Sequence, residues 1–79
     1  MSEPFGDLAK RLRTARTRKL LTQEELAEFS GIGRATIARL EAGGLQPRMK
    51  TIRALARALE LDPRELVPDP ESIWPATGR

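Results

Sequence analysis

The feature that most restricts the fold is a tight corner between two short amphipathic segments, in the stretch LTQEELAEFSGIGRATIARLEAGG. Thr22 and Glu25 stand at the spacing of a capping box, which predicts that a helix begins at residue 23. Gly31 can adopt a positive φ and end that helix near residue 29. The next apolar repeat begins almost at once, so a second helix is predicted over 34–42, before Gly43 and Gly44.

Three further helices are predicted from apolar residues that recur at helical spacing. One covers about 4–19 and another about 49–60, while a short one begins at Pro63, with Asp62 as its N-cap, and ends near residue 67. No stretch alternates in the manner of a β-strand. The chain is therefore predicted to be all-α, with five helices in a compact domain over 1–67. A proline-rich tail over 68–79 should be extended.

The composition excludes several classes of function. Cysteine and histidine are both absent, which excludes disulfides, thiolate or imidazole zinc ligands, and catalysis by either residue. The carboxylates form no paired-acid arrangement, so we expect no enzyme, no metal and no cofactor. No apolar run approaches the roughly 20 residues that span a bilayer, and the N-terminus lacks a secretory signal. A cytoplasmic protein without membrane contact is expected.

The net charge of +3 is unevenly distributed along the chain. It is +4 over residues 1–21, −3 over 22–32, +5 over 33–58 and −3 over 59–79. Two basic blocks separated by acidic ones are typical of a localised positive surface that binds a polyanion. Ordinary solvated helix surface can give the same pattern, and charge by itself does not separate the two interpretations.

The predicted helix over 34–42 has two unlike faces. At about 100° per residue, Ile37 and Leu40 fall on an apolar arc, while Arg34 and Arg39 flank a strip of alanines on the other. Small side chains let a helix approach a surface closely, and arginine can form two hydrogen bonds with guanine N7 and O6. A helix that follows a tight corner can enter the major groove of DNA, although a simple helical hairpin has the same spacing. The arginines and alanines favour the groove.

These motifs resemble the helix-turn-helix family of phage lambda repressor and Cro, often called the XRE family. The resemblance covers about residues 8–67. It is carried by TQEELA at 22–27, the glycine turn, TIARLEAG at 36–43 and LDPREL at 61–66. It implies a lambda-repressor-like fold that binds DNA through the helix over 34–42.

The resemblance also implies roles for individual residues. Base contacts are expected from Arg34, Ala35 and Arg39. Phosphate contacts are expected from Gln23, Thr36, Arg48 and Lys50. Arg16 and Glu41 are expected to form a structural ion pair. Gly33 and Arg48 depart from the family, because relatives often carry a capping serine or threonine at the first position and a capping serine at the second.

The C-terminal tail carries Ile73 and Trp74, which can fold back over the core, contribute to a dimer, or dock on another protein. Leu66, Ile73 and Trp74 are therefore candidate dimer or partner contacts. We expect a sequence-specific regulator of transcription that binds double-stranded DNA, a repressor acting as a homodimer on a palindromic operator. The alternative is a protein-interaction module, such as an antitoxin or adaptor subunit, that uses the same fold on a partner.

Overall fold

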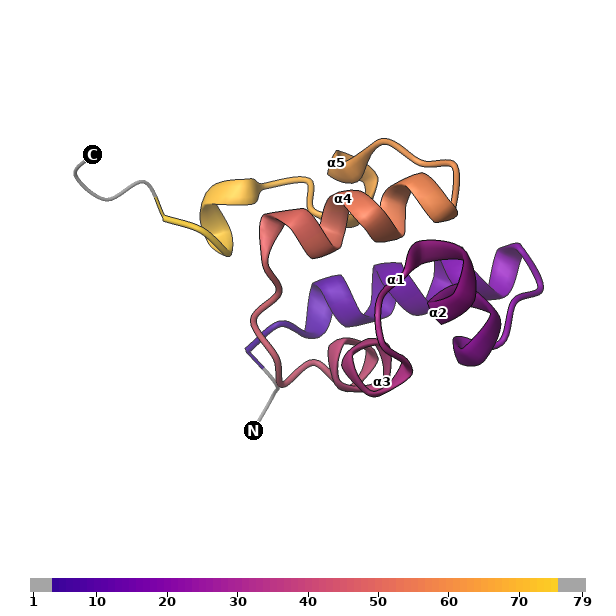
Figure 1. Ribbon diagram of the computed structural model, residues 1–79. Helices are drawn as coiled ribbons and strands as arrows, with labels where there is room; N and C mark the ends of the chain where they lie inside the picture. The colour runs from indigo at the N-terminus through magenta and orange to yellow at the C-terminus, as the bar shows by residue number, and fades with distance from the viewer. Residues whose placement is uncertain (1–3, 76–79) are drawn as a thin grey trace.

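The computed structural model describes residues 4–75, and every regular element in this part of the chain is helical. The helices are α1 (Gly6–Arg18), α2 (Gln23–Ser30), α3 (Arg34–Ala42), α4 (Met49–Ala58) and α5 (Pro63–Leu66), followed by the 3-10 turn η1 (Pro70–Ser72) (Figure 1). The predicted all-α fold with five helices is confirmed, and the predicted helix ends differ from these bounds by no more than two residues.

One apolar core joins the five helices. α1 packs against α3 and α5, α2 packs against α3 and α4, and α4 packs against α5. Figure 1 shows α4 and α5 on one side of α1, with α3 on the other. The buried core residues are Leu8, Leu12, Leu26, Ile37, Leu40, Ile52, Leu55, Ala56, Leu59, Leu66, Val67 and Ile73. Burial of each large side chain contributes about 1.5–3 kcal/mol, which lets so short a chain fold around a single core.

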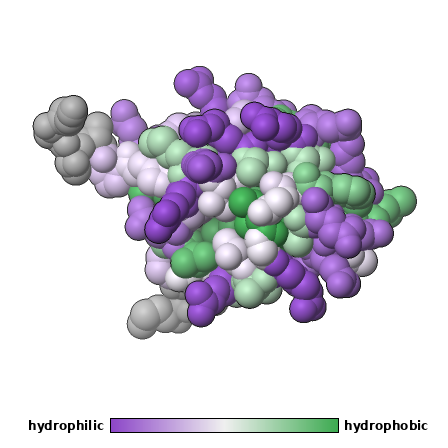
Figure 2. Space-filling model, in the orientation of Figure 1, coloured by the Kyte–Doolittle hydropathy of each residue, from purple (hydrophilic) through white to green (hydrophobic). Residues whose placement is uncertain are grey.

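The surface differs from this core. In Figure 2 hydrophilic side chains surround much of the visible face, and smaller hydrophobic areas lie toward its centre. Among residues 4–75, no helix has the length and apolar character needed to cross a membrane.

The corner between α1 and α2 and the corner between α4 and α5 have the same geometry. Leu20 and Glu60 both take the left-handed backbone conformation, with φ of 59° and 60°. The N–H of the leucine after each donates to a carbonyl in the last turn of the preceding helix, at 3.2 Å from Leu21 and 2.8 Å from Leu61. Lys19 and Glu60 form an ion pair between the two corners. This conformation costs about 1–2 kcal/mol for a residue other than glycine, so the surrounding packing must hold it.

A capping box begins the helix after each corner. In α2 the Thr22 hydroxyl accepts from the Glu25 N–H at 3.0 Å, and the Thr22 N–H donates to the Glu25 carboxylate at 2.9 Å. Asp62 and Glu65 repeat this reciprocal arrangement at α5. Each box satisfies backbone donors that the helix cannot satisfy internally.

The prediction of an extended C-terminal tail is wrong for the described part of this segment, which contains the short turn η1. The backbone N–H groups of Ile73 and Trp74 donate to the Pro70 carbonyl at 3.1 and 2.8 Å. Proline suits the first position of such a turn, because its fixed φ is helical and no N–H is needed there. Ile73 is buried and joins the core, so this segment folds back over the domain. Residues 76–79 of the predicted tail lie outside the described residues.

Candidate nucleic-acid interface

Helix α3 presents the two faces that its sequence predicts. Ile37 and Leu40 are fully buried, while Arg34 and Arg39 are exposed. Ala35, Ala38 and Ala42 are also exposed, whereas Thr36 is half-buried. Neither arginine forms a side-chain hydrogen bond or ion pair within residues 4–75. The outer face of α3 therefore offers two guanidinium groups, with five N–H donors each, beside side chains too small to hold a partner away.

An ion pair fixes α3 against α1. Arg16 Nε donates to Glu41 Oε2 at 2.6 Å and Arg16 Nη2 donates to Glu41 Oε1 at 2.9 Å. Arg16 Nη1 also donates to the carbonyl oxygen of Leu21, at 2.7 Å, in the corner before α2. The two side chains are only 15% and 5% exposed. The hydrogen bond to Glu41 raises the pKa of the Arg16 guanidinium and outweighs the opposing effect of burial.

Gln23 joins the same cluster from the first turn of α2. Its Nε2 donates to Glu41 Oε1 at 3.1 Å, so the side chain braces the C-terminal end of α3. A carboxamide nitrogen has two hydrogens, and this bond uses one of them. The other hydrogen leaves Gln23 able to donate to an acceptor outside the protein.

Among the described helices, α3 and α4 begin without a side-chain cap, as α1 does at Phe5. Gly33 at α3 and Arg48 at α4 make no capping hydrogen bond, in contrast to the capping boxes at α2 and α5. The first backbone N–H groups of α3 and α4 therefore receive no acceptor from a cap. Such groups carry partial positive charge and can bind an anion, such as a phosphate. Arg48 and Lys50 are exposed at the start of α4 and form no ion pair with another described residue.

The residues expected as dimer or partner contacts, Leu66 in α5 and Ile73 and Trp74 in the tail, lie mostly inside this domain. Leu66 is 1% exposed and Ile73 is 8% exposed, so neither has surface to offer a partner in this structure. Trp74 is half-buried, and its indole Nε1 donates to the Pro47 carbonyl at 2.9 Å. Gln46 Nε2 donates to the Ile73 carbonyl at 2.8 Å. Sequence reasoning assigned nothing to Gln46 or Pro47, because no motif marks residues that meet a distant segment only in the folded chain.

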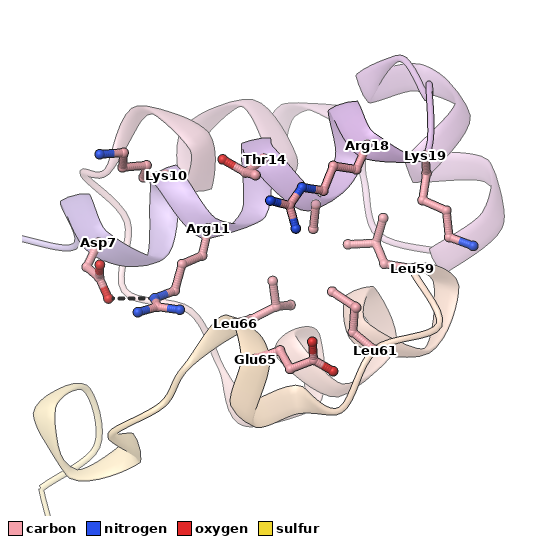
Figure 3. A pocket seen from close by; sticks show the side chains of 11 residues that line it. Asp7, Lys10, Arg11, Thr14, Arg18, Lys19, Leu59, Leu61, Glu65 and Leu66 are labelled. Atoms are coloured by element: carbon pink, nitrogen blue, oxygen red, sulfur yellow. Dashed lines mark hydrogen bonds and ion pairs between the residues drawn. The ribbon is translucent and has the colours of Figure 1, made fainter.

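A separate hollow lies between α1 and the corner that joins α4 to α5 (Figure 3). Its α1 wall includes Arg11, which pairs with Asp7 at 2.9 Å across the edge of the hollow. No residue of α3, or of the loop before α4, lines it. The hollow is therefore distinct from the candidate interface. Within residues 4–75 no group of three or more acidic, histidine or cysteine side chains could hold a metal ion.

The helix-turn-helix family matches residues 12–66 of this chain. Among solved structures, the chain is similar to the restriction-modification controller protein C.AhdI from Aeromonas hydrophila, with 40% sequence identity and a TM-score of 0.76. That similarity covers 78% of this chain and 94% of the controller protein.

Three curated proteins are also similar. The chain is 33% identical over 69 residues to an uncharacterized HTH-type transcriptional regulator, y4dL, of Sinorhizobium fredii. It is 42% identical over 59 residues to another such regulator, RghRB, of Bacillus subtilis, and 33% identical over 64 residues to the cryptic phage CTXphi transcriptional repressor RstR of Vibrio cholerae. These matches cover 87%, 73% and 81% of this chain. They span only 34%, 40% and 58% of the relatives' own lengths.

Proposed function

This chain belongs to the helix-turn-helix family, and on that premise we propose that it regulates transcription by binding a specific sequence of double-stranded DNA. The observation that carries the proposal is the outer face of α3. There Arg34 and Arg39 are exposed beside exposed alanines, and neither has a side-chain partner among residues 4–75. A helix that only met solvent would need no such combination of free guanidinium groups and minimal side chains.

Base recognition is assigned to three side chains of α3. Arg34 and Arg39 each bind the N7 and O6 atoms of a guanine, and each such pair contributes about 1–3 kcal/mol of discrimination against a wrong base. Ala35 contacts a thymine methyl group or simply permits close approach. The burial of Ile37 and Leu40 supports this assignment, because it fixes which side of α3 faces outward.

Phosphate contacts set the position of α3 in the groove. Gln23 donates with its remaining amide hydrogen, and Thr36 donates with its hydroxyl group. Arg48 and Lys50 neutralise backbone charge at the start of α4, where the uncapped N–H groups add partial positive charge. Such contacts carry no sequence information, but they make binding depend steeply on salt concentration.

The regulator acts as a homodimer on a palindromic operator and represses the gene to which it binds, in the cytoplasm. One nine-residue helix reaches the edges of only a few base pairs, too few to single out one site among many competitors. Two copies that read half-sites about 34 Å apart double the sequence that is recognised. The similarity to a protein named as a transcriptional repressor supports the direction of regulation.

Selection of binding sequences from random double-stranded DNA tests this function. We expect an enriched motif with two-fold symmetry, and an affinity for it that falls steeply as salt increases. Sedimentation of the protein with and without the selected duplex gives the number of copies bound. Recovery of no motif, together with flat salt dependence, would contradict the proposal and favour the alternative of a protein-interaction module.

A further inference from the structure

Two hydrogen bonds run in opposite directions between the C-terminal segment and the loop before α4. The indole Nε1 of Trp74 donates to the Pro47 carbonyl at 2.9 Å, and Gln46 Nε2 donates to the Ile73 carbonyl at 2.8 Å. Each bond therefore uses a side chain of one segment and a backbone oxygen of the other. We call this pair of bonds the tail–loop clasp.

Leu45 packs against the core and Pro47 is buried, but the loop has few other hydrogen bonds. At its start the Gly43 carbonyl accepts from the Phe5 N–H at 3.0 Å, and at its end the Arg48 carbonyl accepts from the Ile52 N–H at 3.1 Å. Between these points, loop residues 44–47 form no backbone–backbone hydrogen bond within the described part of the chain. The tail–loop clasp is thus the main polar restraint on the middle of the loop.

The restrained carbonyl belongs to the peptide group that leads into α4. A peptide group is a rigid plane, and in the trans form its carbonyl and N–H point in opposite directions. A hydrogen bond that fixes the Pro47 oxygen therefore also fixes the direction of the Arg48 N–H. Arg48 is the N-cap residue of α4, with φ of −90° and ψ of 150°, so its side chain leaves the backbone from this fixed plane.

The tryptophan side of the clasp is itself held in place. Ile73 is anchored in the core, and the Trp74 N–H donates to the Pro70 carbonyl at 2.8 Å. The indole ring, Gln46, Pro47 and Arg48 line one hollow together with Met49. The clasp therefore connects the apolar core, through a short turn, to the residue that begins α4.

We propose that Trp74, together with Gln46, is a positioning residue for DNA binding: it holds the loop so that Arg48 meets a backbone phosphate. This role rests on the proposed function, since it concerns how the same surface binds DNA. Any event that pulls the C-terminal segment away, such as a partner that binds it, releases the loop and weakens the phosphate contact. The C-terminal segment thereby controls affinity without touching DNA.

A double-mutant cycle tests the positioning role of Trp74, with affinities measured for the duplex that the wild-type protein selects. Arg48→Ala should lower affinity about tenfold and reduce the slope of log K against log salt by about one. Trp74→Phe retains an aromatic ring but lacks the indole donor, and should lower affinity about three- to tenfold with a matching loss of slope. Gln46→Ala should act in the same direction. Arg48→Ala should lower DNA affinity much less in the Trp74→Phe protein than in the wild type.

Leu61→Ala is the matched control. It removes half-buried apolar contacts at the corner between α4 and α5, so it lowers stability without touching the clasp. Its folded form should keep the wild-type affinity and salt slope, which separates positioning from general destabilisation. The role of Trp74 would be overturned if Trp74→Phe kept both quantities, or if Arg48→Ala cost the same with and without Trp74. Failure of the wild type to bind any duplex in a salt-dependent manner would overturn the proposed function itself.

Discussion

Arg16 and Glu41 are distant in sequence, yet two hydrogen bonds of 2.6 and 2.9 Å join their side chains and tie the last turn of α1 to the end of α3. Both side chains are largely shielded from solvent. Helix α3 therefore cannot shift along α1 without separating the two charges. The pair holds the outer face of α3 at a fixed orientation.

Removal of one member of this pair should strongly destabilise the protein. Glu41→Ala leaves the Arg16 guanidinium shielded and unpaired, and we expect the free energy of unfolding to fall by about 3–5 kcal/mol. Urea unfolding followed by circular dichroism measures the loss. Asp7→Ala is the control, since it breaks the exposed pair between Asp7 and Arg11 and should cost less than about 1 kcal/mol. Equal, small losses in both variants would show that the pair does not hold α3.

Arg34→Ala should change specificity more than stability. Its side chain has no partner among residues 4–75, so the unfolding free energy should change by less than about 0.5 kcal/mol. Discrimination at one base pair of the selected duplex should fall by about 1–3 kcal/mol. Affinities for the selected duplex and for its single-base variants measure this effect. The control is Arg64→Ala, on α5, which should leave the base preference at every position unchanged. If Arg34→Ala also keeps the wild-type base preference at every position, Arg34 does not read a base.

Arg48→Ser should raise stability and lower DNA affinity at the same time. Serine can cap α4, where Arg48 makes no capping bond, and a good cap contributes about 0.5–2 kcal/mol relative to alanine. Arg48→Ala lacks both the cap and the charge, so it separates the two effects. Thermal unfolding should rank Ser above Ala, while both should lose about one unit of salt slope. If the Arg48→Ser and Arg48→Ala proteins unfold at the same temperature, the missing cap of α4 does not lower the stability of the protein.

The ion pair between Lys19 and Glu60 should make the stability of the protein depend on pH. The hydrogen bond from Lys19 and its charge lower the pKa of the Glu60 carboxyl from its ordinary value of 4.5. Because the folded pKa is the lower one, the stabilisation is present above about pH 4.5 and is lost as pH falls through the folded value. Carbon-13 NMR titration of Glu60 should show the lowered pKa, and Lys19→Met should return it toward 4.5. Arg18→Met serves as the neighbouring control and should leave the Glu60 titration unaltered.

The helices and the family could be predicted from the sequence because their signals are local. Thr22 with Glu25 and Asp62 with Glu65 mark helix starts by spacing alone, and the apolar repeats mark which faces are buried. The resemblance to the lambda repressor and Cro family is confirmed by the family match over most of the chain. The contact between Arg16 and Glu41 was expected from that resemblance, since nothing in their spacing shows that they meet.

Other features could not be predicted because they depend on the folded chain. Leu20 and Glu60 are left-handed, a conformation that the sequence signals only through glycine or asparagine. The bond between Trp74 and Pro47 joins segments with no shared periodicity. Folding back of Ile73 over the core was one of the predicted alternatives, but the turn η1 that carries it there was not predicted, because the three prolines indicated an extended tail. The assignments of individual base and phosphate contacts remain predictions.

The outward arc of α3 takes no part in closing the domain. Arg34, Ala35 and Arg39 are exposed. The hydrogen bonds of the two matching corners and the ion pair between Arg16 and Glu41 involve none of these three side chains. Under the proposed function, changes on that arc alter what the helix recognises without disturbing the fold that carries it. In evolution, a descendant of this chain can acquire a new target through a few codon changes, with no need to restore a lost fold first.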